Sequence, residues 1–163
     1  MKNILLSIST TRQSPKAIQH AINEAKKENA KLIILFIVNP DIPLLILDKM
    51  MDVGFMGDSP SKQLYQSLLD EYKERGSKIL DNISEEAKSK GVKIQTSLIE
   101  GEFIEECLKI INKEKPLKVI LTRSERSDLS RFLFGSAVKS LKNKSPSPIE
   151  IIDENQKNSP NFL

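Results

Sequence analysis

The amino-acid sequence predicts a doubly wound α/β domain, an open parallel sheet covered by helices on both faces. Two observations carry this prediction. Short apolar segments alternate along the chain with segments of helical periodicity, which is the order of repeated strand–helix–strand units. The chain has 163 residues, enough for one domain with its own core. We expect that domain to span residues 1–153 and to be followed by a flexible tail at 154–163.

The first strand–helix–strand unit is the clearest. Asn3–Ser9 (NILLSIS) and Lys31–Val38 (KLIILFIV) are predicted to be buried parallel strands, because each is short and almost wholly apolar. Between them, Ser14 is a suitable N-cap and Pro15 a suitable first helical residue. Two such strands joined by one helix favour parallel pairing with a right-handed crossover.

An insert at Asn39–Pro60 interrupts the alternation. Prolines and glycines punctuate it, yet it is rich in leucine, isoleucine and methionine. Long connections in compact domains are usually functional or mobile. Two interpretations stand side by side: a short helix that covers a pocket mouth or a partner, or a helical excursion packed on the sheet edge.

The second half of the chain continues the pattern. Ser61–Lys90 keeps helical apolar spacing, and Gly91 follows it as a C-cap would. Gly76 lies inside this helix at a cost of about 1 kcal/mol relative to alanine. The further expected elements are a strand at Val92–Leu98, a helix that begins at Gly101-Glu102, a strand at Lys118–Thr122, a helix that runs through Lys142 and a strand at Ile149–Ile152.

Composition excludes several classes of function. The chain has 25 Lys and Arg against 22 Asp and Glu, and both signs are interspersed, which argues against a nucleic-acid surface. The apolar run Ile4–Leu6 is too short for a signal core or a membrane span, so we expect a cytoplasmic protein without a membrane partner. A single cysteine fits a reducing compartment.

The single cysteine and the single histidine also bear on chemistry. Together they offer too few soft ligands for a structural zinc site. Cys107 falls near the buried side of its helix and is predicted to be core rather than a nucleophile. His20 is placed beside the apolar stripe of the first helix, where it could face solvent, and no orienting partner for a general base is evident in the sequence.

Leu121–Ser140 is the segment best suited to a binding site. A polar loop there joins a strand to a helix start, and backbone N–H groups at such a start favour anions. Arg123, Arg126 and Arg131 could pair with phosphate. For each arginine the alternative is an ordinary solvated surface charge.

These segments together resemble the universal stress protein superfamily. The resemblance rests on NILLSIS, SPKAIQHAINEAKKENAKL and LIILFIV for the opening unit, on GVKIQTSLIEGEFIEECLKIINKEKPLKVIL for the middle, and on LSRFLFGSAVKSLKNKSPSPIEII for the end. It implies a five-stranded parallel sheet of order 3-2-1-4-5, Rossmann-like or flavodoxin-like and of the adenine nucleotide α-hydrolase type. It also implies a cytoplasmic homodimer, for which the edge strand Ile149–Ile152 is the natural pairing surface.

The same resemblance locates a candidate nucleotide pocket. Many members bind ATP between the first and fourth strands, through G-x2-G-x9-G-[ST] after the fourth strand and an Asp that ends the first. Gly135-Ser136 match the last pair, whereas Thr122 and Glu125 stand at the first two glycines and Ser9 stands at the Asp. The candidate pocket residues are Ser9, Thr10, Ile37, Thr122, Arg123, Gly135 and Ser136.

The departures from the motif predict altered or lost ATP binding. Side chains at glycine positions obstruct the approach of phosphate to backbone N–H groups, and Glu125 would repel it. The leading hypothesis is therefore a homodimeric stress-response module that acts through a protein partner and is not an enzyme. The alternatives are a universal stress protein that retains a modified nucleotide or anion site, and a slow nucleotide hydrolase. The chain shows no Walker-type loop and no Ser/His/Asp arrangement that would favour the last.

Overall fold

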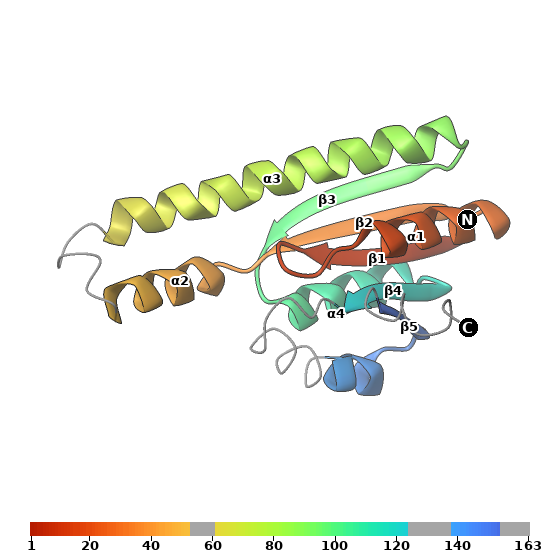
Figure 1. Cartoon of the computed structure of the whole chain (residues 1–163). Coiled ribbons are helices and arrows are strands. Elements are labelled where there is room, and N and C mark those ends of the chain that lie inside the picture. Colours follow the sequence, from red (N-terminus) through yellow and green to blue (C-terminus); the bar gives the residue numbers. More distant parts are fainter. Residues whose placement is uncertain (53–60, 124–137, 154–163) are drawn as a thin grey trace, which may run out of the picture.

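The computed structural model describes residues 1–52, 61–123 and 138–153, which form one parallel sheet with helices on both faces (Figure 1). The strand order is β3-β2-β1-β4-β5, and each neighbouring pair is parallel. This is the predicted order. The strands are β1 (Asn3–Ser9), β2 (Lys31–Val38), β3 (Ile94–Glu100), β4 (Lys118–Arg123) and β5 (Ile149–Asp153).

Two apolar clusters, one on each face of the sheet, make up the core. On one face, alternate residues of β1 and β2 such as Leu6 and Phe36 pack against α1 (Pro15–Lys27) and α3 (Ser61–Ser89). On the other face, Leu5 and Leu35 pack against α4 (Phe103–Glu114) and the helical residues 138–144. The central strands are apolar on both faces because helices cover both, as expected for a parallel sheet.

Helix α1 begins where the sequence predicts. Ser14 has an extended backbone and its Oγ accepts a hydrogen bond from the N–H of Ala17 at 3.0 Å, with Pro15 at the first helical position. Ala17, Ala21 and Ala25 form its buried stripe, each at most 1% exposed. Small side chains on this stripe let the helix lie close to β1 and β4.

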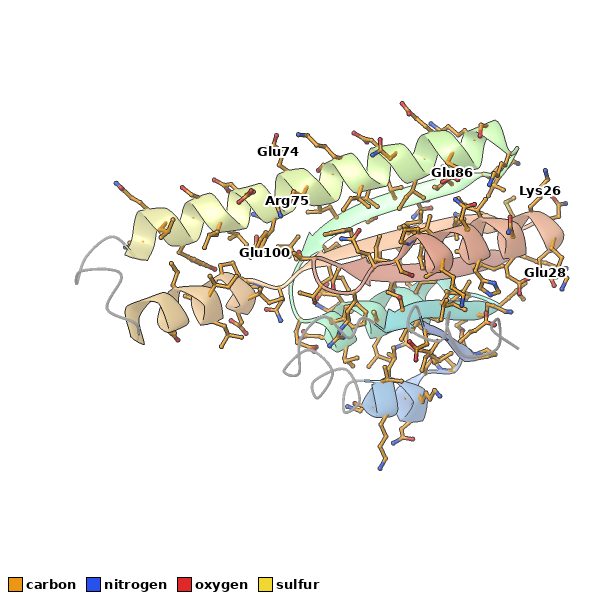
Figure 2. The ribbon with its side chains drawn as sticks, in the orientation of Figure 1. Lys26, Glu28, Glu74, Arg75, Glu86 and Glu100 are labelled. Atoms are coloured by element: carbon orange, nitrogen blue, oxygen red, sulfur yellow. The ribbon has the colours of Figure 1, made fainter. Side chains whose placement is uncertain are left out.

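The close packing of α3 on the sheet explains why a glycine, Gly76, lies in the interior of this helix. A Cβ on Gly76 would lie 2.7 Å from Cε1 of Phe36 on β2 and 2.9 Å from Cδ1 of Leu98 on β3. The helix therefore approaches the sheet more closely at Gly76 than any side chain permits. On the opposite side of the helix Glu74 points into solvent (Figure 2).

The first half of α3 and helix α2 (Asp41–Asp52) extend past the carboxyl ends of the strands (Figure 1). The predicted helix in the insert is thus confirmed, and it packs on α3. Leu47 is 3% exposed, whereas Leu44 and Leu45 are 46% and 44% exposed. Residues 53–60 of the insert lie outside the described residues.

Strand boundaries differ from the predicted ones by one or two residues. β3 begins at Ile94 rather than Val92, because Val92 still belongs to the turn after α3 and donates its N–H to the carbonyl of Ala87 at 2.9 Å. The strand then runs to Glu100, since β2 continues to Val38 and pairs with it. β5 likewise extends to Asp153.

No helix within 1–52, 61–123 and 138–153 is long and apolar enough to cross a membrane.

Candidate functional site

The chain reverses its direction of winding between β1 and β4. Helix α1, which follows β1, lies on one face of the sheet, and the helical residues 138–144, which come after β4, lie on the other face. Open α/β sheets bind ligands in the crevice at such a switch point. The predicted residues Ser9, Thr10 and Thr122 all lie there.

Ser9 closes a tight turn with Arg12. The N–H of Ser9 donates to the carbonyl of Arg12 at 3.1 Å, and the N–H of Arg12 faces both the carbonyl and the Oγ of Ser9 at 3.2 and 3.1 Å. Ser9 is 7% exposed. The Ser9 hydroxyl oxygen therefore already accepts a hydrogen bond within the turn, although the hydroxyl can still donate one.

Thr122 is turned inward, toward the start of α1. Its Oγ1 donates to Oγ of Ser14 at 3.2 Å, and both residues are 1% exposed. The Ser14 oxygen thus receives hydrogen bonds from Thr122 and from the N–H of Ala17. A threonine at the first glycine position of the motif therefore ties β4 to the first turn of α1.

Thr10 and Ile37 have different surroundings. The Thr10 hydroxyl is buried and has no hydrogen-bond partner in the described part of the chain. A polar group left in that state destabilises the protein unless something else binds it. Ile37 is 1% exposed and pairs with Ser9 across β1 and β2, so it contributes an apolar wall next to the turn.

Arg12 was missed by the sequence prediction. Its guanidinium carbon lies 4.6 Å from the centre of the Phe103 ring, which opens α4. Burial lowers the pKa of Arg12, while Cys107 and Glu102 oppose that shift. A cation therefore stands at the carboxyl end of β1. Its only signal in the sequence was a basic residue three positions after a strand.

Cys107 is a core residue, as predicted. It is fully buried, and burial raises the pKa of its thiol to about 12, against a smaller lowering effect of the Ser7 hydroxyl. A thiol in this state is not a nucleophile at neutral pH.

Of the remaining predicted pocket residues, Arg123 lies within the described part of the chain. Arg123 ends β4 and pairs with Asp153 of β5 through the backbone. Gly135 and Ser136, which match the motif, lie outside the described residues, and so does Glu125. The structure therefore brings together Ser9, Thr10, Ile37 and Thr122, and it adds Arg12 and Ser14 to them.

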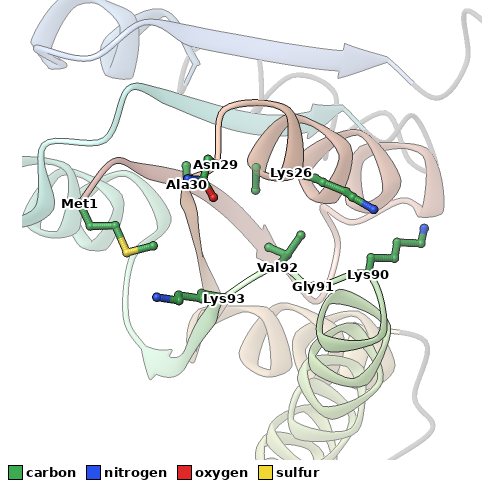
Figure 3. A pocket seen from close by; sticks show the side chains of 9 residues that line it. Met1, Lys26, Asn29, Ala30, Lys90, Gly91, Val92 and Lys93 are labelled. Atoms are coloured by element: carbon green, nitrogen blue, oxygen red, sulfur yellow. The ribbon is translucent and has the colours of Figure 1, made fainter.

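A second hollow lies at the opposite end of the sheet (Figure 3). It has a volume of about 470 Å³, and Lys26, Lys90 and Lys93 lie around it. Helices α1 and α3 both end beside it, and cations there stabilise the helix carboxyl ends. The lysines thus have a structural reason to be present.

Known proteins resemble this chain over most of its length. The model of the universal stress protein family matches residues 1–152. Universal stress protein MJ0531 of Methanocaldococcus jannaschii is 24% identical over 156 residues, which cover 96% of this chain and 84% of that protein. Universal stress protein YxiE of Bacillus subtilis is 27% identical over 150 residues, which cover 91% of this chain and 97% of that protein.

Solved structures share the fold. The hypothetical protein MJ0577 superposes with a TM-score of 0.70 at 20% identity, covering 97% of this chain and 98% of that one. A universal stress protein in complex with cAMP has a TM-score of 0.59 at 17% identity over 93% of this chain and 96% of its own. One from Archaeoglobus fulgidus in complex with dAMP has a TM-score of 0.53 at 13% identity over 93% and 98%. The sheet order and the family match over residues 1–152 lead to one conclusion: the chain belongs to the universal stress protein family.

Proposed function

We propose that this protein is a stress-response module that acts by binding, as a homodimer and without catalysing a reaction, and that its ATP binding is altered or lost. The observation that carries the proposal is the inward orientation of two motif positions. Ser9 accepts a hydrogen bond from its own turn, and Thr122 donates to the N-cap of α1. Neither is arranged as the family's acid and glycine are expected to be.

The physical consequence concerns the phosphates. A glycine after β4 lets phosphate oxygens approach backbone N–H groups, and a side chain at that position prevents the approach. Thr122 also fixes the end of β4 against α1, through a hydrogen bond between two residues that are 1% exposed. We therefore expect a triphosphate to bind weakly.

Calorimetric titration of the whole chain with ATP tests this directly. The matched variant restores the motif as Ser9→Asp, Thr122→Gly and Glu125→Gly in one chain. We expect little heat from the unaltered protein and saturable binding by the restored variant. Micromolar ATP affinity in the unaltered chain would overturn the proposal. A restored variant that is folded but does not bind would refute the motif as the cause.

A modified ligand site is the second candidate function, and a specific observation favours it. The buried Thr10 hydroxyl lacks a partner in the described part of the chain, and the Arg12 guanidinium stands two residues away. A small anionic ligand could accept a hydrogen bond from the Thr10 hydroxyl close to the Arg12 cation, and two of the similar solved structures hold cAMP or dAMP, each of which has a single phosphate. In titrations with AMP, Thr10→Val should weaken binding at least about tenfold if one hydrogen bond to a charged group is lost. Equal AMP affinity in both proteins would remove this candidate.

The homodimer is proposed to form through the outer edge of β5. Val119 donates its N–H to the carbonyl of Pro148 at 2.9 Å, so alternate residues of β5 face β4. The N–H and C=O groups of Ile149 and Ile151 consequently point to the outer edge, where no strand pairs with them within 138–153.

A proline substitution in β5 and a matched alanine substitution at the same position test the proposed dimer edge. Ile151→Pro removes an outward N–H without removing a hydrogen bond to β4, and Ile151→Ala removes the same side chain but keeps that N–H. Sedimentation at micromolar concentration should show a dimer for the unaltered chain and for Ile151→Ala, and a monomer for Ile151→Pro. A monomeric unaltered chain would contradict the proposed assembly.

A further inference from the structure

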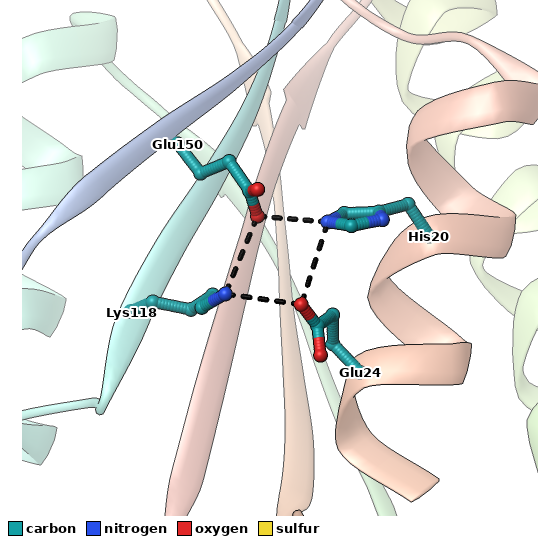
Figure 4. A network of polar contacts seen from close by, with 4 residues as sticks. All are labelled: His20, Glu24, Lys118 and Glu150. Atoms are coloured by element: carbon teal, nitrogen blue, oxygen red, sulfur yellow. Dashed lines mark hydrogen bonds and ion pairs between the residues drawn. The ribbon is translucent and has the colours of Figure 1, made fainter. Parts of the chain in front are cut away.

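A polar cluster joins α1 to the β4–β5 edge, away from the candidate nucleotide residues at the carboxyl ends of β1 and β4. It consists of His20 and Glu24 on α1, Lys118 on β4 and Glu150 on β5, and it is called the His20 cluster below (Figure 4). Nε2 of His20 lies 2.7 Å from Oε1 of Glu150, a residue 130 positions later. Glu150 is thus a partner for His20 that was not evident in the sequence.

The donor atoms of this cluster converge. One ring nitrogen of His20 and one carboxylate oxygen each of Glu24 and Glu150 all lie within 4.8 Å of one another. Nε2 is 3.8 Å from the Glu24 oxygen. A tetrahedral zinc ion places its nitrogen and oxygen ligands about 3.3 Å apart, at bond lengths of roughly 2.0–2.2 Å. Small side-chain rotations therefore bring the three atoms to ligand spacing.

The cluster already receives a positive charge. Nζ of Lys118 lies 3.1 Å from Oε1 of Glu24 and 3.5 Å from Oε1 of Glu150, so an ammonium group sits between the two carboxylates (Figure 4). The side chains are shielded but reachable, with exposed fractions of 15% for Glu24, 30% for Lys118 and 38% for Glu150. A lysine head on a flexible stem can leave for solvent when a stronger cation arrives.

The rest of the chain has no other imidazole and no exposed thiol that could bind zinc instead. His20 is the only histidine of the sequence, and Cys107, the only cysteine, is fully buried. Imidazole and carboxylate are ligands that zinc accepts, and two of them at positions i and i+4 of a helix share one face. The set of one nitrogen and two carboxylates also leaves a fourth position for water, and in this it differs from the closed structural zinc site that the sequence excludes.

We propose that His20, Glu24 and Glu150 form a binding site for a divalent cation of the zinc class, in which Lys118 is the cation that the metal displaces. The site spans α1 and the edge strand β5, so a bound ion would join the two elements directly.

Zinc titration of the untagged, full-length chain after removal of metal by a chelator is the test. Lys118→Met removes the competing ammonium and should tighten zinc binding at least about tenfold, since it removes one like charge beside the ion. Lys113→Met, which changes an exposed lysine of α4, should leave the affinity unchanged. Adding His20→Gln to Lys118→Met should weaken binding at least about tenfold, because the only imidazole ligand is lost.

The single histidine supplies an independent readout. Its ring resonances in the proton NMR spectrum should shift on addition of zinc at one equivalent. If Lys118→Met does not fold, Glu150→Gln in the otherwise unaltered chain should weaken zinc binding and abolish that shift. The proposal is overturned if neither the unaltered chain nor Lys118→Met binds zinc, or if binding leaves the His20 resonances unmoved.

Discussion

Ser14 is the residue on which two distant parts of the fold depend. Its oxygen caps α1 through Ala17 and accepts a hydrogen bond from Thr122 at the end of β4. Replacement by alanine should lower the free energy of unfolding by about 2 kcal/mol, because the cap is lost and the Thr122 hydroxyl is left buried without its acceptor.

Denaturant unfolding checks this expectation. Ser67→Ala, at an exposed position of α3, is the matched control and should change the free energy of unfolding by less than about 0.5 kcal/mol. Equal stability of the two variants would mean that the Ser14–Thr122 contact contributes nothing.

Cys107 makes the stability of the fold depend on alkaline pH. Burial raises the pKa of its thiol from the ordinary 9.0 to about 12, so the unfolded chain loses the proton first as the pH rises. Stability should therefore fall between those two values, by about 1 kcal/mol per pH unit from this group. Cys107→Ala should show a correspondingly shallower decline when unfolding is measured from pH 8 to pH 11, since all other titrating groups are shared. Parallel pH curves would contradict the assigned burial of the thiol.

Among the elements, α3 shows how a local penalty serves tertiary packing. Gly76 is unfavourable for an isolated helix, yet alanine there would place a methyl group 2.7 Å from the buried Phe36 ring. Gly76→Ala should therefore destabilise the protein by about 1 kcal/mol or more, because overpacking exceeds the gain in helix propensity.

The neighbouring residue provides the comparison. Ser77→Ala, exposed on the same helix, should be neutral or stabilising by a few tenths of a kcal/mol. Thermal unfolding of both variants separates the two effects. A Gly76→Ala variant more stable than the unaltered protein would show that α3 can move away from the sheet at no cost.

The sequence predicted elements better than it predicted their contacts. Ser14-Pro15 fixed the start of α1 and Gly91 the end of α3, because caps are local chemistry. The start of β3 was placed two residues early, since the alternation of Val92–Leu98 has no sharp beginning. The contact of His20 with Glu150 was out of reach because it joins residues 130 positions apart. The placement of Arg12 over Phe103 depends in the same way on the assembled sheet and α4.

At the scale of the whole molecule, the strand order could be predicted from the sequence, whereas the side-chain orientations in the candidate site could not. The strand order, including the switch between β1 and β4, follows from the alternation of elements and the resemblance, and the structure confirms it. The chemistry at the carboxyl ends of β1 and β4 depends on the orientation of individual side chains. A hydroxyl at position 9 or 122 could face a ligand or the protein, and the hydrogen bonds of Ser9 and Thr122 resolve this toward the protein.

The nucleotide content of the purified protein tests the central claim most directly. The chain is isolated without added ligand, denatured, and its extract analysed for adenine nucleotides by chromatography and mass spectrometry. If the altered motif positions weaken or abolish ATP binding, the purified protein should contain far less than one ATP per chain. Recovery of ATP in a ratio close to one per chain would contradict it, because the inward-facing Ser9 and Thr122 would then be compatible with full triphosphate binding.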